Sequence, residues 1–186
     1  EIDFKSAPTN FTGKIPSAIG NLTALTYLKI AGNNNLGGII PSSIGNLVNL
    51  TALDLWGNSF TGSIPKEIGN LTKLVSLNLM NNEFSGTSPA EFQQLSGIKY
   101  LYINGNNLEN ISKLPTGIQY LYVDRNKLDF DDLEPLASLQ IPNFEYREQE
   151  DIDLVTKIIN GQTVLSMMPG GTKTTYQWYY NNQIID

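Results

Sequence analysis

The chain has 186 residues, 40% of them hydrophobic, a net charge of −6, and neither cysteine nor histidine. This length is enough for one ordinary domain, or for one domain and a fragment of a second. The first hundred residues balance six Lys and Arg against six Asp and Glu, whereas residues 101–186 carry six basic and twelve acidic residues. The sequence has no basic cluster to bind nucleic acid or an anionic membrane surface, and no apolar run long enough for membrane insertion. Without cysteine, disulfides and thiolate metal sites are excluded.

An internal repeat runs through most of the chain. It reads Leu-x-x-Leu-x-Leu-x-x-Asn and, in its longest copies, continues into Phe-x-Gly-x-Ile-Pro-x-x-Ile-Gly-Asn-Leu. Residues 1–24 keep only the second half of this unit, so we interpret them as a degenerate first repeat. Clear copies begin at Leu25, Leu50, Leu74, Ile98 and Ile118, at intervals of 25, 24, 24 and 20 residues. A weak last copy begins at Ile141, with Phe144 and Tyr146 in strand positions, as expected where eroded terminal repeats cap an open stack.

Each copy predicts one short strand of a parallel sheet. Apolar and variable residues alternate with a period of two, which is typical of a strand with one buried face. The buried pairs are Leu28/Ile30, Leu53/Leu55, Leu77/Leu79, Leu101/Ile103 and Leu121/Val123. The Asn that ends each motif is interpreted as structural, because a buried amide can satisfy backbone groups of neighbouring coils where the chain turns. These residues are Asn33, Asn58, Asn82, Asn106 and Asn126, and an extra residue lies in Asn33-Asn34-Asn35.

One proline lies in the return segment of each long copy. Proline fixes φ and cannot donate to a strand ladder, so we expect the chain to leave regular pairing there and to form one 3₁₀ or helical turn. The prolines are Pro16, Pro41, Pro65 and Pro89.

The segment from Phe60 to Leu71, which reads Phe-Thr-Gly-Ser-Ile-Pro-Lys-Glu-Ile-Gly-Asn-Leu, resembles the plant-type subclass of leucine-rich repeats. The resemblance covers about residues 9–97, and the shorter units to residue 146 resemble those of bacterial surface proteins such as internalins. It implies an α/β solenoid over residues 1–146, with a parallel sheet on the concave face and short 3₁₀ or helical turns on the convex face. Plant extracellular members usually carry Cys-paired caps, which this chain lacks, so a secreted or cell-surface bacterial protein is favoured.

Residues 147–186 depart from the repeat. Four acidic residues between positions 148 and 153 are followed by an apolar run and by Pro169-Gly170-Gly171. The segment Thr175–Asn182 resembles the Trp-bearing strand of immunoglobulin-like modules, of which about forty residues supply only the first strands. We therefore expect a partial, β-rich segment whose Trp178, Ile184 and Ile185 would be exposed. Such a segment could pack on the last repeat, pair with another chain, or be disordered.

The outward residues of the predicted strands form the candidate binding surface, because packing does not dictate their identity. Large side chains gather there, and Tyr and Trp are enriched at binding hot spots. The candidate ligand-binding residues are Trp56, Met80, Tyr100, Tyr102, Tyr120, Tyr122 and Asp124. The alternative interpretation is that strand propensity alone favours these tyrosines, or that they pack against the C-terminal segment.

Catalysis and metal binding are not expected. With no His or Cys, an enzyme would depend on carboxylates such as Asp54, Asp124, Glu145 and Asp151, which lie on different coils without an evident enclosing pocket. The acidic stretch from Asp129 to Glu134 lacks the glycine and spacing of a calcium loop, so a capped helical turn is favoured there. No cofactor is implied.

The sequence therefore favours a non-catalytic recognition or adhesion module that binds a protein partner through its concave sheet. Carbohydrate binding is an alternative, because aromatic faces beside Asn and Asp can stack on sugar rings, and rings lying flat in a groove would favour it. A structural spacer that presents downstream domains is a third hypothesis. It predicts that replacing the four tyrosines with serine leaves all binding intact.

Overall fold

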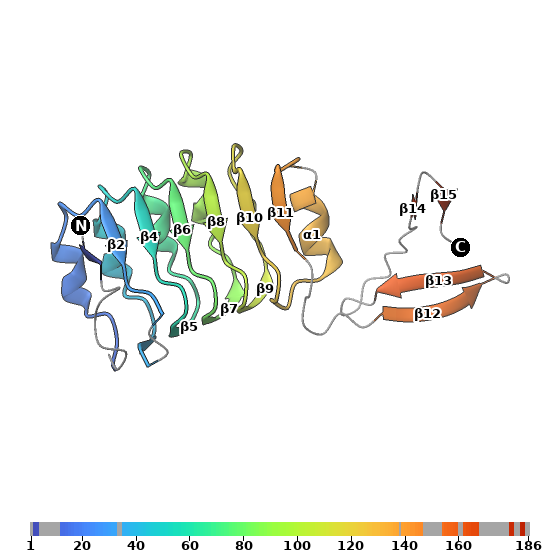
Figure 1. Ribbon diagram of the computed structural model, residues 1–186, viewed down its shortest axis with the longest axis horizontal. Helices are drawn as coiled ribbons and strands as arrows, with labels where there is room; N and C mark the ends of the chain where they lie inside the picture. The colour runs from blue at the N-terminus through green and yellow to red at the C-terminus, as the bar shows by residue number, and fades with distance from the viewer. Residues whose placement is uncertain are drawn as a thin grey trace.

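The computed structural model describes residues 2–3, 12–32, 35–137, 139–146, 154–159, 162–167, 179–180 and 183–184. The repeats stack as successive coils, each contributing one strand to a seven-stranded sheet (Figure 1). In spatial order these strands are β1 (Ile2–Asp3), β2 (Tyr27–Lys29), β4 (Ala52–Asp54), β6 (Ser76–Asn78), β8 (Tyr100–Tyr102), β10 (Tyr120–Tyr122) and β11 (Asn143–Glu145). All neighbours are parallel and paired without a register shift. The predicted solenoid and its concave parallel sheet are confirmed.

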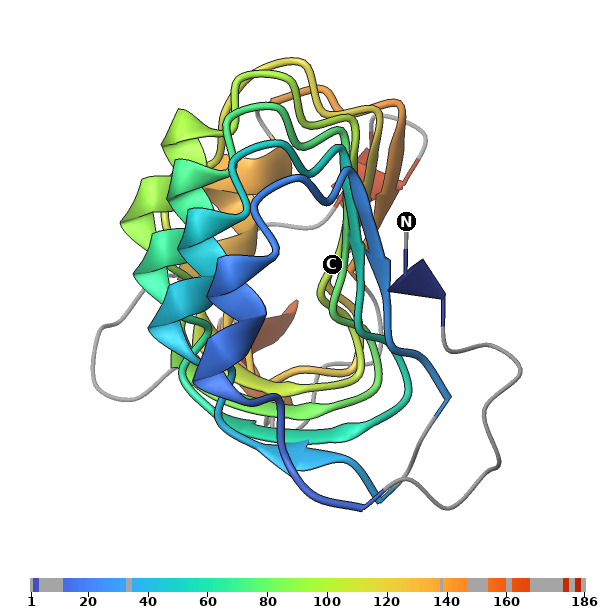
Figure 2. The same ribbon diagram turned by 90° about the vertical axis from the view of Figure 1, so that its left-hand side faces the viewer.

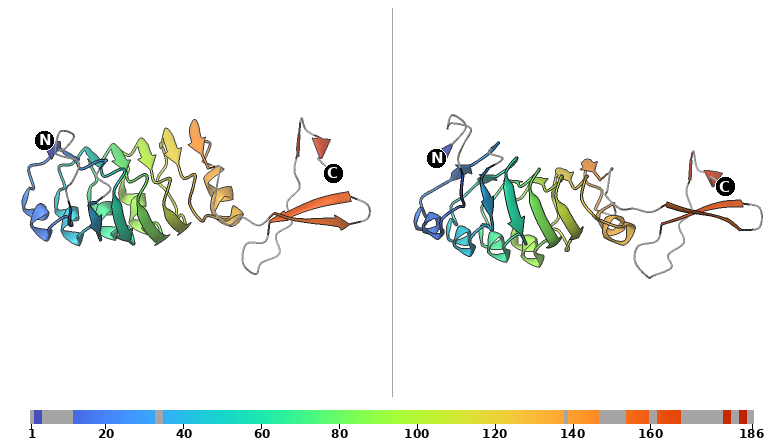
Figure 3. Two further views of the ribbon diagram at one scale, coloured as in Figure 1. Left: turned by 60° about the horizontal axis from the view of Figure 1, so that its bottom comes forward. Right: turned by 90° about the horizontal axis from the view of Figure 1, so that it is seen from below.

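Short 3₁₀ helices lie on the side of the coils opposite this sheet (Figure 2; Figure 3). They are η1 (Ser17–Asn21), η2 (Ser42–Asn46), η3 (Lys66–Asn70) and η4 (Ala90–Gln94). Each begins directly after one of the predicted prolines, which holds φ between −73° and −61° at the helix N-cap. The prediction of one 3₁₀ turn after each proline is therefore confirmed. An α-helix, α1 (Phe130–Ala137), replaces the 3₁₀ turn in the coil that follows β10.

A second parallel sheet, which the sequence analysis did not predict, precedes the prolines. It consists of β3 (Gly37–Gly38), β5 (Ser59–Gly62), β7 (Glu83–Thr87) and β9 (Asn107–Asn110). Its Gly38, Gly62 and Gly86 have φ between 74° and 76°, a conformation that other residues rarely adopt. Gly62 and Gly86 belong to the Phe-x-Gly part of the repeat, and Gly38 occupies the same position in the copy that begins at Leu25. The chain leaves regular pairing at the prolines as predicted, but only after this additional ladder.

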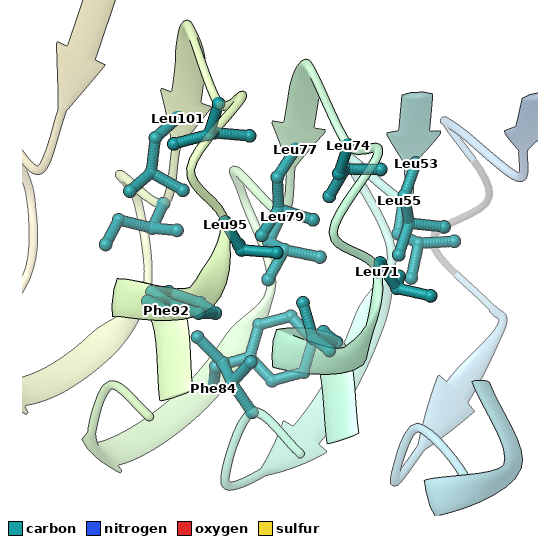
Figure 4. Packing of buried hydrophobic residues seen from close by; sticks show 14 of the residues in the cluster. Leu53, Leu55, Leu71, Leu74, Leu77, Leu79, Phe84, Phe92, Leu95 and Leu101 are labelled. Atoms are coloured by element: carbon teal, nitrogen blue, oxygen red, sulfur yellow. The ribbon is translucent and has the colours of Figure 1, made fainter. Parts of the chain in front are cut away.

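The space between the sheets and the 3₁₀ turns is filled by one continuous apolar core (Figure 4). Its leucine columns are almost inaccessible to solvent, and the Phe60 and Phe84 rings stack with centroids 6.3 Å apart. The 3₁₀ turns approach one another so closely that a Cβ atom at Gly69 would lie 2.7 Å from the Glu91 carbonyl oxygen. Glycine at this repeat position therefore sets the spacing of the coils.

The recurrent asparagines are structural, as predicted. The Asn82 amide nitrogen donates to the Leu55 and Leu79 carbonyls at 3.0 and 3.1 Å, and its oxygen accepts the Phe60 N–H at 3.1 Å. Asn106 and Asn126 repeat this pattern one and two coils later. Asn58 makes the donations, but its oxygen is buried and accepts no hydrogen bond within the described residues. Asn33 lies outside them.

Both terminal repeats take part in the sheet. β1 pairs with β2, and β11 pairs with β10 so that Phe144 stands beside Leu121. Phe144 packs against the core, and its ring centroid is 5.0 Å from that of Tyr146.

Beyond residue 146 the structure describes two antiparallel hairpins. β12 (Leu154–Ile159) pairs with β13 (Gln162–Met167), and β14 (Tyr179–Tyr180) pairs with β15 (Gln183–Ile184). Trp178 and Ile185 lie outside the described residues, and of Ile184 only the backbone is described. The division at residue 147 and the immunoglobulin-like assignment stay predictions. Among the described helices, none has the length and apolar character that crossing a membrane requires.

Candidate functional site

The outward residues of the seven-stranded sheet form straight columns, because each strand is in register with the next. One column contains Tyr27, Ala52, Ser76, Tyr100, Tyr120 and Asn143, and the next contains Lys29, Asp54, Asn78, Tyr102, Tyr122 and Glu145. Both columns consist of the outward residues that the period-two alternation of the sequence predicts. Their members in β2 to β10 are half-buried, whereas the residue between them in each of these strands is fully buried.

Four tyrosines on β8 and β10 come together as two cross-strand pairs, which we name the tyrosine block: Tyr100, Tyr102, Tyr120 and Tyr122. The Tyr100 and Tyr120 rings stack with centroids 5.2 Å apart and planes at 22°. The Tyr102 and Tyr122 rings meet edge to face, with centroids 5.1 Å apart and planes at 69°. Both arrangements fall within the range that aromatic pairs prefer. Each ring is therefore braced by its neighbour on the next coil.

The phenol groups of the tyrosine block also interact electrostatically. Burial raises the pKa of the Tyr102 hydroxyl, and repulsion from the ionised forms of Tyr122, Tyr100 and Tyr120 raises it further. The Tyr102 hydroxyl group therefore stays protonated near neutral pH, able to donate and to accept a hydrogen bond. The block presents apolar rings together with polar hydroxyl groups.

Trp56 and Met80 occupy the next outward position, two residues beyond the ends of β4 and β6. They do not form one cluster with the tyrosines. The Trp56 ring, 37% exposed, lies over Gly32 of the preceding coil, on the side away from the tyrosine block. Met80 is half-buried, and its coil separates Trp56 from β8. Of the predicted site residues, the structure thus brings the four tyrosines and Asp124 onto two neighbouring coils.

Asp124 is the second residue after β10 and is paired with the residue that follows it, Arg125. Its Oδ2 atom accepts a hydrogen bond from Arg125 Nε at 3.1 Å, while its Oδ1 atom is buried without a partner in the described part of the chain. Asn104 holds the equivalent position after β8, and its Oδ1 atom is likewise buried and unpartnered there. Asn104 is not among the candidate residues predicted from the sequence, because its sequence position gives no sign that it is 3% exposed.

The acidic stretch after β10 forms a helix cap. The Asp129 N–H donates to Asp132 Oδ2 and the Asp132 N–H donates to Asp129 Oδ1, both at 3.1 Å, at the start of α1. This reciprocal arrangement is a capping box, so the prediction of a capped helical turn is confirmed. Burial, together with the charges of Asp129 and Asp131, raises the pKa of Asp132 to about 6. Within the described residues, no group of three or more acidic side chains is placed to hold a metal ion.

Comparison with known proteins agrees with the repeat geometry. Family models of the leucine-rich repeat match residues 49–108, 72–128 and 24–47. No curated protein matches the sequence.

Among solved structures, the plant peptide hormone receptor RGFR1, in complex with RGF2, is 30% identical with a TM-score of 0.67 over 75% of this chain and 23% of that chain. The ectodomain of the receptor kinase SOBIR1 from Arabidopsis thaliana is 27% identical with a TM-score of 0.58, over 67% of this chain and 72% of that chain. The protein LIC12759 of Leptospira interrogans is 27% identical with a TM-score of 0.63, over 74% and 35%. The chain thus spans about a quarter of the hormone receptor and about a third of the Leptospira protein.

Proposed function

Because this chain belongs to the leucine-rich-repeat family, we propose that it is a non-catalytic recognition module that binds a protein partner through the tyrosine block on its concave sheet. Similar solved structures include a receptor in complex with a peptide hormone, which supports a protein or peptide ligand. The family comparison supports the scaffold, and the tyrosine block supports the proposed position of the site on it.

The observation that carries this proposal is the clustering of four large, half-buried aromatic side chains on two adjacent strands. Strand formation does not require this, because β4 and β6 pair in the same register with Ala52 and Ser76 in the corresponding column. Tyr offers a large contact area at a low entropic cost and keeps a polar group, which suits a binding hot spot. The braced rings lose little further freedom on binding.

The orientation of the rings favours a protein over a carbohydrate. A sugar-binding platform presents an open ring face on which a sugar can lie, but Tyr100 and Tyr120 cover one face of each other. In the second pair, the edge of one ring meets the face of the other, so one of the two faces there is also covered. The block thus offers a ligand ring edges and hydroxyl groups beside the ring faces that the pairing leaves uncovered, which suits the mixed apolar and polar surface of a peptide.

The location, the source and the C-terminal segment are the subjects of separate proposals. We propose a secreted or cell-surface location, which is supported by the receptor ectodomains among the similar structures. A bacterial source is supported by the Leptospira protein, but plant receptors show similar identity. For residues 147–186, the start of an immunoglobulin-like module and pairing with another chain are proposals that rest on the sequence alone.

The test is selection of ligands on the full chain from a random-peptide display library, with a glycan array probed in parallel. We expect peptides that bind the wild type and lose about a hundredfold or more in affinity when all four tyrosines are replaced by serine, since hot-spot losses of about 2 kcal/mol or more are typical. The matched control is Tyr27→Ser, in the same column three strands away.

Circular dichroism and thermal unfolding of both variants show whether the solenoid is intact. Binding of a glycan that depends on the tyrosines would favour the carbohydrate hypothesis. Peptide binding that survives the fourfold replacement in a folded protein would contradict the proposed site.

A further inference from the structure

Asn104 and Asp124 lie side by side immediately beyond the tyrosine block. The Ile103 N–H donates to the Tyr122 carbonyl at 3.0 Å and the Gly105 N–H donates to the Asp124 carbonyl at 2.9 Å, so the two coils remain paired across this position. Ile103 and Val123 are fully buried. The alternation that turns Tyr102 and Tyr122 outward therefore places Asn104 and Asp124 next to them on the same face.

Each of the two side chains holds an acceptor atom that lacks a donor. Asn104 is 3% exposed and Asp124 is 8% exposed, and both Oδ1 atoms are buried and unpartnered among the described residues. A buried acceptor without a donor is unfavourable, and natural proteins contain few of them. Here two such atoms occur on adjacent coils, at the edge of the cluster that the proposed function assigns to ligand binding.

The remaining oxygen of Asp124 is already used. Arg125 Nε donates to Oδ2, and this orients the carboxylate while the Arg125 side chain stays half exposed. Among the described residues, Oδ1 is therefore the Asp124 carboxylate oxygen that still lacks a donor, and it lies on the coil next to Asn104. The pair thus combines a negative charge, a neutral acceptor and adjacent aromatic rings.

We propose that Asn104 and Asp124 form a subsite for an arginine side chain of the protein partner. This inference rests on the proposed function and names the chemistry of its ligand. A guanidinium group has several N–H donors in one plane and can give one to each Oδ1 atom. It also stacks favourably against aromatic rings such as those of Tyr102 and Tyr122. Lysine, a compact point charge, would satisfy the two oxygens less well, and an acidic side chain would be repelled.

The test uses the peptide that binds the full chain most tightly in a tyrosine-dependent manner, taken from the random-peptide selection described above. We expect arginine to be enriched at one position among such peptides. The best peptide is then synthesised with arginine, with lysine, and with citrulline, which keeps the shape of arginine and loses its charge. Citrulline should weaken binding to the wild type about tenfold or more, with lysine intermediate, as for the loss of a charge-assisted contact.

Variants of the protein, combined with these peptides, form a double-mutant cycle. Asp124→Asn should weaken binding of the arginine peptide about tenfold, and citrulline should then cause little further loss, because both changes remove the same contact. The matched control is Asp54→Asn, which makes the same charge change on the same sheet in a residue paired with Lys29 at 3.1 Å, and it should stay within about twofold of the wild type.

The outcomes separate this inference from the proposed function. Tyrosine-dependent peptides without arginine, or equal binding of the arginine and citrulline peptides, would overturn the subsite and leave the proposed function standing. Failure to select any tyrosine-dependent peptide would overturn both. If Asn104 instead donated to Asp124 within the chain, Asn104→Leu would lower the melting temperature by several degrees and leave the discrimination against citrulline unchanged, which would also overturn the subsite.

Discussion

The two halves of the concave sheet have the same strand register but differ in whether their outward polar side chains find hydrogen-bond partners within the chain. In the polar half, on β2, β4 and β6, Lys29 pairs with Asp54, whose Oδ1 atom accepts the Trp56 N–H at 3.4 Å. On β6, Asn78 accepts the Met80 N–H at 3.2 Å in the same way. These acceptors are satisfied within the chain.

In the aromatic half, on β8 and β10, the residues equivalent to Asp54 and Asn78 are Tyr102 and Tyr122. A tyrosine hydroxyl lies too far from its own backbone to accept the N–H two residues later. The acceptors of this half are instead Asn104 and Asp124, and each retains a buried oxygen without a donor in the described structure. Because the register is the same in both halves, the difference lies in the side chains alone. The proposed binding site rests on this difference between the two halves.

The largest expected effect on stability comes from replacing the buried asparagines, because they support the coils of both halves. Asn106→Ala should lower the free energy of unfolding by about 3 kcal/mol, since it leaves the Ile103, Leu79 and Phe84 backbone groups unsatisfied. Asn82→Ala should cost about the same. Asn58→Ala should cost about 1 kcal/mol less, since the Asn58 oxygen accepts no hydrogen bond among the described residues. Urea unfolding of the three variants checks this order, and an equal loss in all three would contradict it.

The shared architecture was predictable from the sequence because it depends on spacing. The strand positions, the outward columns and the function of the asparagines follow from a repeat of 20 to 25 residues combined with an alternation of two. The second sheet was not predictable in this way. Its strands have two to five residues and include glycines, so they show no hydrophobic period of their own.

The candidate site was predictable only as a set of columns. Register places Tyr100 beside Tyr120, but whether the two rings stack or lie flat depends on side-chain packing between coils. The same limit applies to Trp56, whose ring turns toward Gly32, and to Asn104, whose burial comes from the coil beside it. Sequence patterns indicate which residues share a face, whereas neighbouring coils decide what those residues present to a ligand.

A pH-dependent effect on stability is expected at the end of the aromatic half, at the start of α1. The pKa of Asp132 is about 6 in the folded chain and 3.8 when unperturbed, so between these pH values the folded state binds more protons. Stability from this group should therefore fall as pH rises from about 4 to 6. Asp132→Asn keeps an oxygen for the Asp129 N–H and should raise the free energy of unfolding at pH 7 by about 1–2 kcal/mol, with little effect at pH 4.

Thermal unfolding between pH 4 and 7 measures this effect. The control is Glu109→Gln, which removes the same charge from an exposed residue on β9. The same pH dependence in the wild type and in Asp132→Asn would show that the capping carboxylate does not contribute.

The smallest expected effect concerns the ion pair between Lys29 and Asp54 in the polar half. The Lys29 and Asp54 side chains are 20% and 17% exposed and form a single 3.1 Å contact across β2 and β4. A double-mutant cycle with Lys29→Met and Asp54→Asn should give a coupling energy below about 1 kcal/mol, since the pair lies on the sheet surface, where both side chains keep contact with solvent. The coupling should shrink further in 0.5 M salt, a test concentration at which the Debye length falls to roughly 4–5 Å. A salt-independent coupling of several kcal/mol would show instead that the pair is held as rigidly as the tyrosine block. The polar half would then also be a preorganised surface, and the contrast between the two halves would no longer single out the aromatic half as the binding site.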